Sequence, residues 1–397
     1  MDFALSDEEQ AFQAAVRKFG DKVLRPHERR IDSEGRIPDE VLAEMARLGL
    51  LAMPVPTEYG GMGASAVLTE LAAEEIGRGD SSMATAVFFL LEAGWGWVMG
   101  RYGTEEARRE VLPPVCAGKA FLGIGTTEPT GGSDLGAMRT NSRRDGDGFV
   151  VRGEKAFLSG VEEAKRLGGG HLTLTRAEGG SGYNFLYIPT NSPGISTQKF
   201  ENMGRMGIST GALTYDRVRV PERYLIGAEG RGFDRAMEGF SVARTFVSAA
   251  CIGAAERALE TGMAYIKQRT AFGRPLGKFE GIQFELVDLY AQVEAVKWQC
   301  RRAAWLLDTY PLRGDPSHRS EVDRAVASVK LTAPPIAFEA VKRVMMWFGA
   351  AGYTKDVGLE LGLRGIMSYM VGAEGGLNIM RIILGRELLG KEFVPYK

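Results

Sequence analysis

The hydrophobic and polar positions change their spacing twice along the chain. From Ser6 to about Lys119, apolar residues recur at helical intervals, and Ser6 with Glu9 forms a capping-box signature before the first of these runs. Between about Ala120 and Gly230 the apolar positions instead form short β-branched or aromatic runs, separated by clusters of Gly, Pro, Asn and Asp. Long helical patterns return from Phe233 onward. The pattern therefore predicts helices, then strands, then helices.

This order predicts an α+β protein of three parts. We expect an N-terminal helical domain over residues 1–119, a central small β-barrel or sandwich over 120–232, and a C-terminal four-helix bundle over 233–397. Strands and helices do not alternate as in a βαβ unit, so the pattern argues against a Rossmann nucleotide-binding fold. The helices of the last part are expected over Ser241–Gln268, Glu280–Tyr310, Ser320–Phe348 and Leu377–Leu389.

Composition and charge narrow the class of protein. The formal net charge is -1 with acids and bases interspersed, which argues against a nucleic-acid-binding protein. The three cysteines and three histidines are scattered, so we expect reduced thiols, a cytoplasmic location and no metal site. The first residues, MDFALSDEEQ, do not have the pattern of a leader sequence. The longest apolar stretch, Ala84–Met99, is interrupted by Glu92 and glycines, so no membrane insertion is expected.

The segment GTTEPTGGSD, Gly125 to Asp134, follows the first predicted strand. Backbone amides in a glycine-rich turn can face a phosphate or an electron-rich ring, and Thr and Ser hydroxyls add further donors. As a pattern of small residues alone, the same segment describes an ordinary turn equally well.

Together with four other segments, this one resembles the acyl-CoA dehydrogenase family. The resemblance implies the helical, β, helical fold and FAD-dependent α,β-dehydrogenation of an acyl-CoA. It also implies an electron-transfer flavoprotein as electron acceptor and a homotetramer built as a dimer of dimers. The segments occur in family order across nearly the whole chain: FLGIGTTEPTGGSDLGAMRT; GDGFVVRGEKAFLSG; GISTGALTYDRVRVP with LIGAEGRGF; YIKQRTAFGRPLGKFEGIQ; and AEGGLNIMRIILGREL.

The resemblance points to Glu374 as the catalytic base. Glu374 and Gly375 match the Glu-Gly that precedes the last family helix, and the alternative base position of some relatives corresponds to Ala243, which has no acid. Removing an α-proton requires a carboxylate whose pKa is raised by desolvation, and the apolar residues around Glu374 are consistent with that. In relatives the backbone N–H of the base also binds the developing enolate oxygen. Without the resemblance, a solvated loop acid is the better interpretation of Glu374.

The resemblance also implies residues for the cofactor and the substrate. Thr127 and Ser159 resemble the residues that bind the flavin ring, and Arg269 the one that meets the flavin pyrophosphate across a subunit boundary. Arg244 resembles a CoA-binding position, although a salt bridge within the bundle explains it equally well. The FAD-binding candidates are Ile124, Thr126, Thr127, Ser133, Phe157, Ser159, Arg269, Phe272, Gly376 and Asn378, and the substrate-binding candidates are Ser133, Arg244, Glu92 and Gly375.

Several positions depart from the family pattern. Phe157 stands where the family has a Trp beside the flavin, Gly376 where it has a Thr, and Met346 where it has a Gln. Glu92 lies inside the apolar run AVFFLLEAGWGW, where it is either paired with a polar neighbour or subunit, or an acid of the acyl pocket. The aromatic residues of that run either form ordinary core or reduce the pocket to a short, branched or cyclic acyl group.

Two other functions are considered beside acyl-CoA dehydrogenation. The same scaffold supports other flavin chemistry, such as desulfination or nitroalkane oxidation, and the retained Glu374 argues against a desulfinase. A non-catalytic flavin-containing binding protein is the third hypothesis, and the near-neutral charge argues against its nucleic-acid-associated form.

Overall fold

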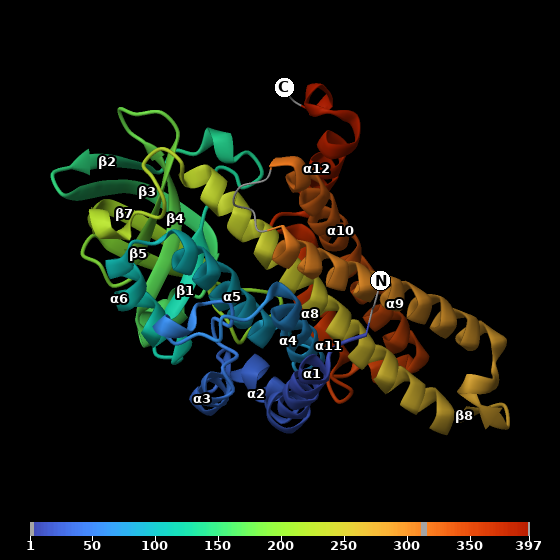
Figure 1. Cartoon of the computed structure of the whole chain (residues 1–397). Coiled ribbons are helices and arrows are strands. Elements are labelled where there is room, and N and C mark those ends of the chain that lie inside the picture. Colours follow the sequence, from blue (N-terminus) through green and yellow to red (C-terminus); the bar gives the residue numbers. More distant parts are fainter. Residues whose placement is uncertain (1–3, 311–315, 396–397) are drawn as a thin grey trace.

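The computed structural model describes residues 4–310 and 316–395, in which helices, a curled sheet and helices follow one another (Figure 1). The Ser6 side chain accepts the Glu9 N–H at 3.2 Å and the Glu9 carboxylate accepts the Ser6 N–H at 2.8 Å, which confirms the predicted capping box. The N-terminal helices are α1 (Asp7–Phe19), α2 (Arg25–Glu34), α3 (Asp39–Arg47), α4 (Ala66–Gly79), α5 (Ala84–Tyr102) and α6 (Glu105–Cys116).

The central sheet has the strand order β1-β4-β2-β3-β7-β6, with β5 paired to β4. Strand β4 runs parallel to β1 and β2, whereas the other pairs are antiparallel. A short helix, α7 (Val161–Leu167), connects β3 to β4 and was not predicted from the sequence. The strands are β1 (Phe121–Gly125), β2 (Asn141–Asp145), β3 (Gly148–Ser159), β4 (Gly169–Ala177), β5 (Tyr183–Pro189), β6 (Ile195–Phe200) and β7 (Thr210–Pro221).

Gly169 allows β1 to lie against β4. It pairs with Phe121 and has a φ of +98°, a conformation that favours glycine. A Cβ at this position would lie 2.1 Å from the carbonyl oxygen of Phe121, so any side chain would push the two strands apart. This pairing sets the position of β1 and of the glycine-rich loop that follows it.

The C-terminal part is dominated by α8, which packs against α4, α5 and α10. The helix begins at Gly232, nine residues before the predicted start at Ser241. Helix α11 was also missed: a Cβ at its Gly365 would lie 2.3 Å from Ser82 O, so glycine is needed here for close packing. These helices are α8 (Gly232–Gln268), α9 (Glu280–Thr309), α10 (Pro316–Trp347), α11 (Leu359–Val371) and α12 (Leu377–Leu389).

A small hairpin, β8 (Thr270–Ala271) with β9 (Arg274–Pro275), follows α8 at the end of the molecule that lies away from the sheet (Figure 1). None of the helices within residues 4–310 and 316–395 combines the length and apolar character that a bilayer crossing requires.

Candidate active site

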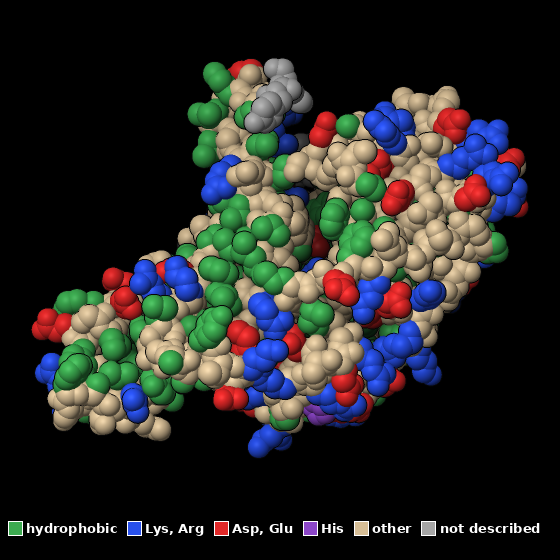
Figure 2. All heavy atoms as spheres, turned by 180° about the vertical axis from the view of Figure 1, so that it is seen from behind, with side chains coloured by type: hydrophobic (Ala, Val, Ile, Leu, Met, Phe, Trp, Pro, Cys, Tyr) green, Lys and Arg blue, Asp and Glu red, His purple; other side chains and the backbone are tan. Residues whose placement is uncertain are grey.

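A cavity of about 1050 Å³ lies between the central sheet and the C-terminal helices. Its walls come from the loop after β1, the end of β3, the segment before β7, the first turns of α8, part of α10, and the loop between α11 and α12. Figure 2 shows a hollow between the projecting C-terminal arm and the lobe that carries the sheet. Segments from the middle and the end of the chain therefore meet here.

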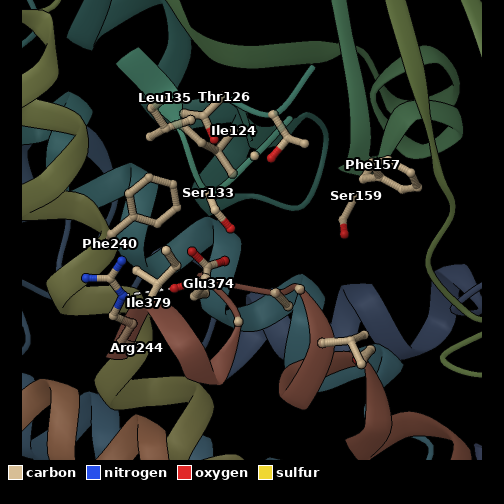
Figure 3. A pocket seen from close by; sticks show the side chains of 18 of the residues that line it. Ile124, Thr126, Ser133, Leu135, Phe157, Ser159, Phe240, Arg244, Glu374 and Ile379 are labelled. Carbon is tan, nitrogen blue, oxygen red and sulfur yellow. Dashed lines mark hydrogen bonds between the residues drawn. The ribbon is translucent and has the colours of Figure 1, made fainter. Parts of the chain in front are cut away.

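The sheet side of the cavity carries most of the predicted cofactor residues. Ile124, Thr126, Thr127 and Ser133 come from β1 and the glycine-rich loop, and Ser159 from the end of β3 (Figure 3). The hydroxyls of the threonines and serines among them can donate to or accept from a polar ligand. The structure thus brings together five positions that the sequence places on two separate segments.

A buried ion pair holds the glycine-rich loop in place. The ammonium of Lys155 donates to the Thr126 carbonyl at 3.1 Å and to the Glu128 carboxylate at 2.9 Å. The same carboxylate accepts the N–H groups of Arg139 and Thr140, both at 2.8 Å. Because both ends of the loop meet at one carboxylate, the hydroxyl groups between them are positioned before any ligand binds.

Phe157 is held at the cavity wall in a strained conformation. Its φ is +60°, and it lies where the pairing of β3 with β7 shifts its register between Ala156 and Leu158. The side chain is 66% exposed. The strained backbone keeps the ring of Phe157 exposed to the cavity. Such an exposed aromatic face suits a planar ligand ring, which would cover it.

Glu374 lies in the loop between α11 and α12, with its carboxylate in the cavity (Figure 3). The residue is only 8% exposed and has a φ of +57°. Arg244, on α8, donates its Nε–H to the backbone carbonyl of Glu374 at 2.8 Å. Among the described residues, no group forms a hydrogen bond with Oε2 of Glu374. The Glu374 carboxylate therefore has a buried oxygen that no described residue satisfies.

The surroundings bring the pKa of Glu374 into the neutral range. Burial raises the pKa, while the positive charges of Arg244, Lys330 and Arg205 lower it, and the net result is a pKa of about 7. A carboxylate with such a pKa is a stronger base than one in water and is still largely ionised just above neutral pH.

Arg205 is a site residue that the sequence did not reveal. It lines the cavity with 8% exposure and donates to Ser159 Oγ at 3.2 Å and to Thr210 Oγ1 at 3.0 Å. In the sequence, one signal alone could have drawn attention to Arg205: it is a charged residue inside the apolar, glycine-containing segment NMGRMGIST.

Four predicted site residues do not line the cavity. Arg269 follows α8, 25 residues beyond Arg244, which corresponds to about 37 Å along the helix. Phe272 lies in the adjoining hairpin and is 95% exposed. Asn378 instead accepts a hydrogen bond from Arg381 at 2.8 Å. The fourth is Glu92.

Glu92 is fully buried behind the cavity wall, to which α5 contributes Leu91. One of its carboxyl oxygens accepts the Leu122 N–H at 3.3 Å, and burial holds its pKa well above the usual value. The neighbouring aromatic residues are core: Phe88 packs on Phe121, and Trp95 on Phe240, with ring centroids 5.3 and 5.2 Å apart.

Gly375 and Gly376 line the cavity beside Glu374. Arg244 lines it too, but its Nε–H is directed to the Glu374 carbonyl, so it contacts the loop that carries Glu374. No group of three or more His, Cys, Asp or Glu side chains in the described part of the chain is arranged to bind a metal ion.

The cavity fits FAD in size and in chemistry. Its volume lies at the upper end of the range of small-molecule sites, as a large cofactor together with a substrate requires. Thr126, Thr127, Ser133 and Ser159 supply the polar groups, and Phe157 supplies an open aromatic face.

Comparison with known proteins agrees with this fit. The chain matches the acyl-CoA dehydrogenase N-terminal domain over residues 6–119, the middle domain over 123–218 and the C-terminal domain over 230–389. It is 32% identical to the probable acyl-CoA dehydrogenase YngJ of Bacillus subtilis, over 98% of this chain and 100% of that protein. It is 31% identical to the mitochondrial isobutyryl-CoA dehydrogenase of Dictyostelium discoideum, over 97% of this chain and 90% of that protein.

A glutaryl-CoA dehydrogenase from Mycobacterium smegmatis, solved in complex with FADH2, has the same fold. The two superpose with a TM-score of 0.88 at 25% identity, over 99% of this chain and 97% of that one. The chain therefore belongs to the acyl-CoA dehydrogenase family. It is an oxidoreductase that uses FAD and acts on acyl-CoA thioesters.

Proposed function

We propose that the protein oxidises the α,β carbon–carbon bond of an acyl-CoA thioester and that Glu374 removes the α-proton. FAD supplies the acceptor, at flavin N5, for the hydride that leaves the β-carbon. The observation that carries the proposal is the Glu374 carboxylate, which is buried in the cavity wall, has one oxygen without a hydrogen-bond partner among the described residues, and has a pKa of about 7. The ionised form accepts the proton from the substrate and becomes the neutral acid.

The loop around Glu374 serves the second requirement of the reaction. When the α-proton leaves, negative charge develops on the thioester oxygen, and we assign the backbone N–H of Glu374 as a donor to it. Arg244 holds the carbonyl of the same residue at 2.8 Å, which orients the peptide plane and so the direction in which the carboxylate points.

We further propose a short, branched or cyclic acyl group. Leu91 and Phe240 line the cavity, and the large side chains of Phe88, Phe89 and Trp95 on the same helix as Leu91 are fully buried. The similarity to an isobutyryl-CoA dehydrogenase supports a compact substrate. Bleaching of the flavin absorbance by a panel of straight, branched, aromatic-tailed and alicyclic thioesters under anaerobic conditions would identify it.

A homotetramer, built as a dimer of dimers, accounts for the residues that lie far from the cavity. Arg269 and Phe272 cannot line the cavity of their own chain, but a second subunit would bring them to the FAD pyrophosphate. Exposed apolar side chains follow α9 at helical spacing and offer a contact surface: Phe284, Val287, Tyr290, Trp298 and Trp305. Size-exclusion chromatography with light scattering tests the assembly.

We propose an electron-transfer flavoprotein as the electron acceptor and the cytoplasm as the location. Met203, which lines the cavity and is 62% exposed, leaves one side of it approachable by a partner. Cys116, Cys251 and Cys300 are free and buried, which suits a reducing compartment. Reoxidation of the bleached enzyme by an electron-transfer flavoprotein, compared with reoxidation by oxygen, tests the acceptor.

Glu374→Gln tests the mechanism. The variant should remain yellow and bind the thioester, while the rate of flavin bleaching falls by about 10²–10⁴-fold because no general base is left. Bleaching at the wild-type rate would show that another group removes the proton.

A further inference from the structure

Lys330, on α10, is a buried cation that reaches the loop of the catalytic base. Its side chain is fully buried, and its ammonium donates to the carbonyl of Tyr369 at 2.6 Å and to that of Gly375 at 3.2 Å. Tyr369 lies in the last turn of α11, where helical carbonyls lack partners, and Gly375 directly follows Glu374. One ammonium group therefore connects the end of α11 to the residue after the base.

The loop needs such a connection because its backbone is strained. Glu374 and Gly375 both have positive φ, +57° and +94°, and a non-glycine residue adopts this conformation only where its surroundings enforce it. Besides Lys330, the Arg244 side chain bonds to Glu374 O, and Gly375 N–H bonds to Gly372 O at 2.8 Å. Two buried cations on two different helices thus hold successive carbonyls of the loop.

Stability alone does not explain a lysine at this position. Burial lowers the pKa of Lys330 to about 8, which shows that its charge is disfavoured there. Its hydrogen-bond partners are neutral carbonyls, and an apolar side chain of similar size would avoid the desolvation of the ammonium.

The charged and titratable groups that act on Lys330 and Glu374 lie on α8, on α11 and in the segment before β7. Arg244 and Cys251 face them from α8, Arg205 from the segment before β7, and Tyr369 from α11. The positive charges among these groups, with that of Lys330 itself, act on the Glu374 carboxylate.

We propose that Lys330 is a positioning residue with two effects. It holds the loop over residues 372–376 so that Glu374 faces the cavity, and its positive charge favours the ionised form of the Glu374 carboxylate. The inference rests on the proposed role of Glu374 and adds a part of the machinery that does not touch the substrate.

Two substitutions in the FAD-loaded enzyme separate the two effects. Lys330→Met removes the donor and the charge, whereas Lys330→Gln removes the charge and keeps an N–H donor on a side chain that is one bond shorter. Flavin bleaching is followed at pH 6.5 and at pH 9. Without the charge the pKa of Glu374 rises, and a rise of one from about 7 lowers the ionised fraction at pH 6.5 about eightfold. Both variants should therefore lose more activity at pH 6.5 than at pH 9, by about eightfold for each such rise.

At pH 9 the carboxylate is ionised in every variant, so the remaining loss reports the position of the loop. Lys330→Met should be slower there than Lys330→Gln, and thioester affinity should remain close to that of the wild type. Lys297→Met is the control, because Lys297 is a largely buried lysine on α9 that bonds to Glu74 and Glu256 at 2.8 Å and does not line the cavity. It should lower stability without changing the pH profile.

Equal fractional losses at the two pH values would overturn the effect of the charge. Equal rates of the two variants and the wild type at pH 9 would overturn the fastening of the loop. If neither variant folds with FAD, Lys330 is a structural residue and the inference is wrong. Glu374→Gln distinguishes the failure of the proposed function from the failure of the role of Lys330. If the flavin of Glu374→Gln still bleaches, the proposed function fails. If Glu374→Gln is inactive but the pH profile of Lys330→Met is unchanged, only the role of Lys330 is refuted.

Discussion

Replacing Glu374 with glutamine should stabilise the protein, and the gain should grow with pH. Burial raises the pKa of this carboxyl from 4.5 to about 7, so between these pH values the folded protein retains a proton that the unfolded chain has released. In the wild type, the contribution of the Glu374 carboxyl to the free energy of unfolding therefore falls as the pH rises from about 4.5 to about 7, and it is constant above that range. The glutamine side chain of the variant does not titrate, so the variant should avoid the loss.

The magnitude follows from the two pKa values. A difference of about 2.5 corresponds to about 3 kcal/mol, since each unit is worth about 1.4 kcal/mol. For 397 residues the unfolding entropy is about 0.8 kcal/mol/K, so the full effect amounts to about 4 °C in Tm.

The assay is thermal unfolding of the FAD-loaded wild type and Glu374→Gln, side by side at pH 5, 6, 7 and 8.5. The difference in Tm between the two proteins should increase over this series and level off above pH 7. Glu58→Gln, at an exposed position, controls for the removal of a negative charge far from the cavity. A difference that stays constant from pH 5 to pH 8.5 would refute the reasoning, because the Glu374 carboxyl would then not be held in its neutral form by the fold.

Three further substitutions test other parts of the structure. Glu92→Gln should leave kcat/KM unchanged, because burial keeps this carboxyl neutral and it lies behind the cavity wall; a changed substrate preference in the thioester panel would place it in the pocket. Lys155→Met should weaken FAD binding about tenfold or more in an equilibrium titration, since the loop over 126–140 loses its anchor; unchanged affinity would contradict the role of the ion pair with Glu128. Phe157→Trp should retain FAD, because the side chain is 66% exposed, whereas Phe157→Ala should release it more readily; equal retention by both variants would exclude stacking.

The order of the parts and the residues of the glycine-rich loop were predictable because their signals are local. Changes in hydrophobic period mark the helical and β segments, and Thr127 and Ser133 lie within one short motif. Helix α11 was missed because its glycines serve packing against the turn at Ser82.

The electrostatics of the site could not be predicted from the sequence. The charges that set the pKa of Glu374 belong to Arg205, Arg244 and Lys330, which lie on three segments far apart in the chain. Nothing local distinguishes Lys330 from a solvated lysine on a helix, and only the packing of α10 against α11 brings it to the loop. The position of Glu92 likewise depends on which way α5 faces, and a helix that is apolar almost throughout does not reveal this.

Gly169 lies outside the cavity, but its lack of a side chain determines the position of a strand that leads into the cavity. Because β1 lies against this glycine at a distance that admits no Cβ, even Gly169→Ala would displace the strand that leads into the Thr126 loop. A screen for loss-of-function variants should therefore recover substitutions at position 169 among proteins that have lost the yellow flavin colour, although this position lies outside the cavity. Second-site revertants should map to the neighbouring strand β1, around Phe121.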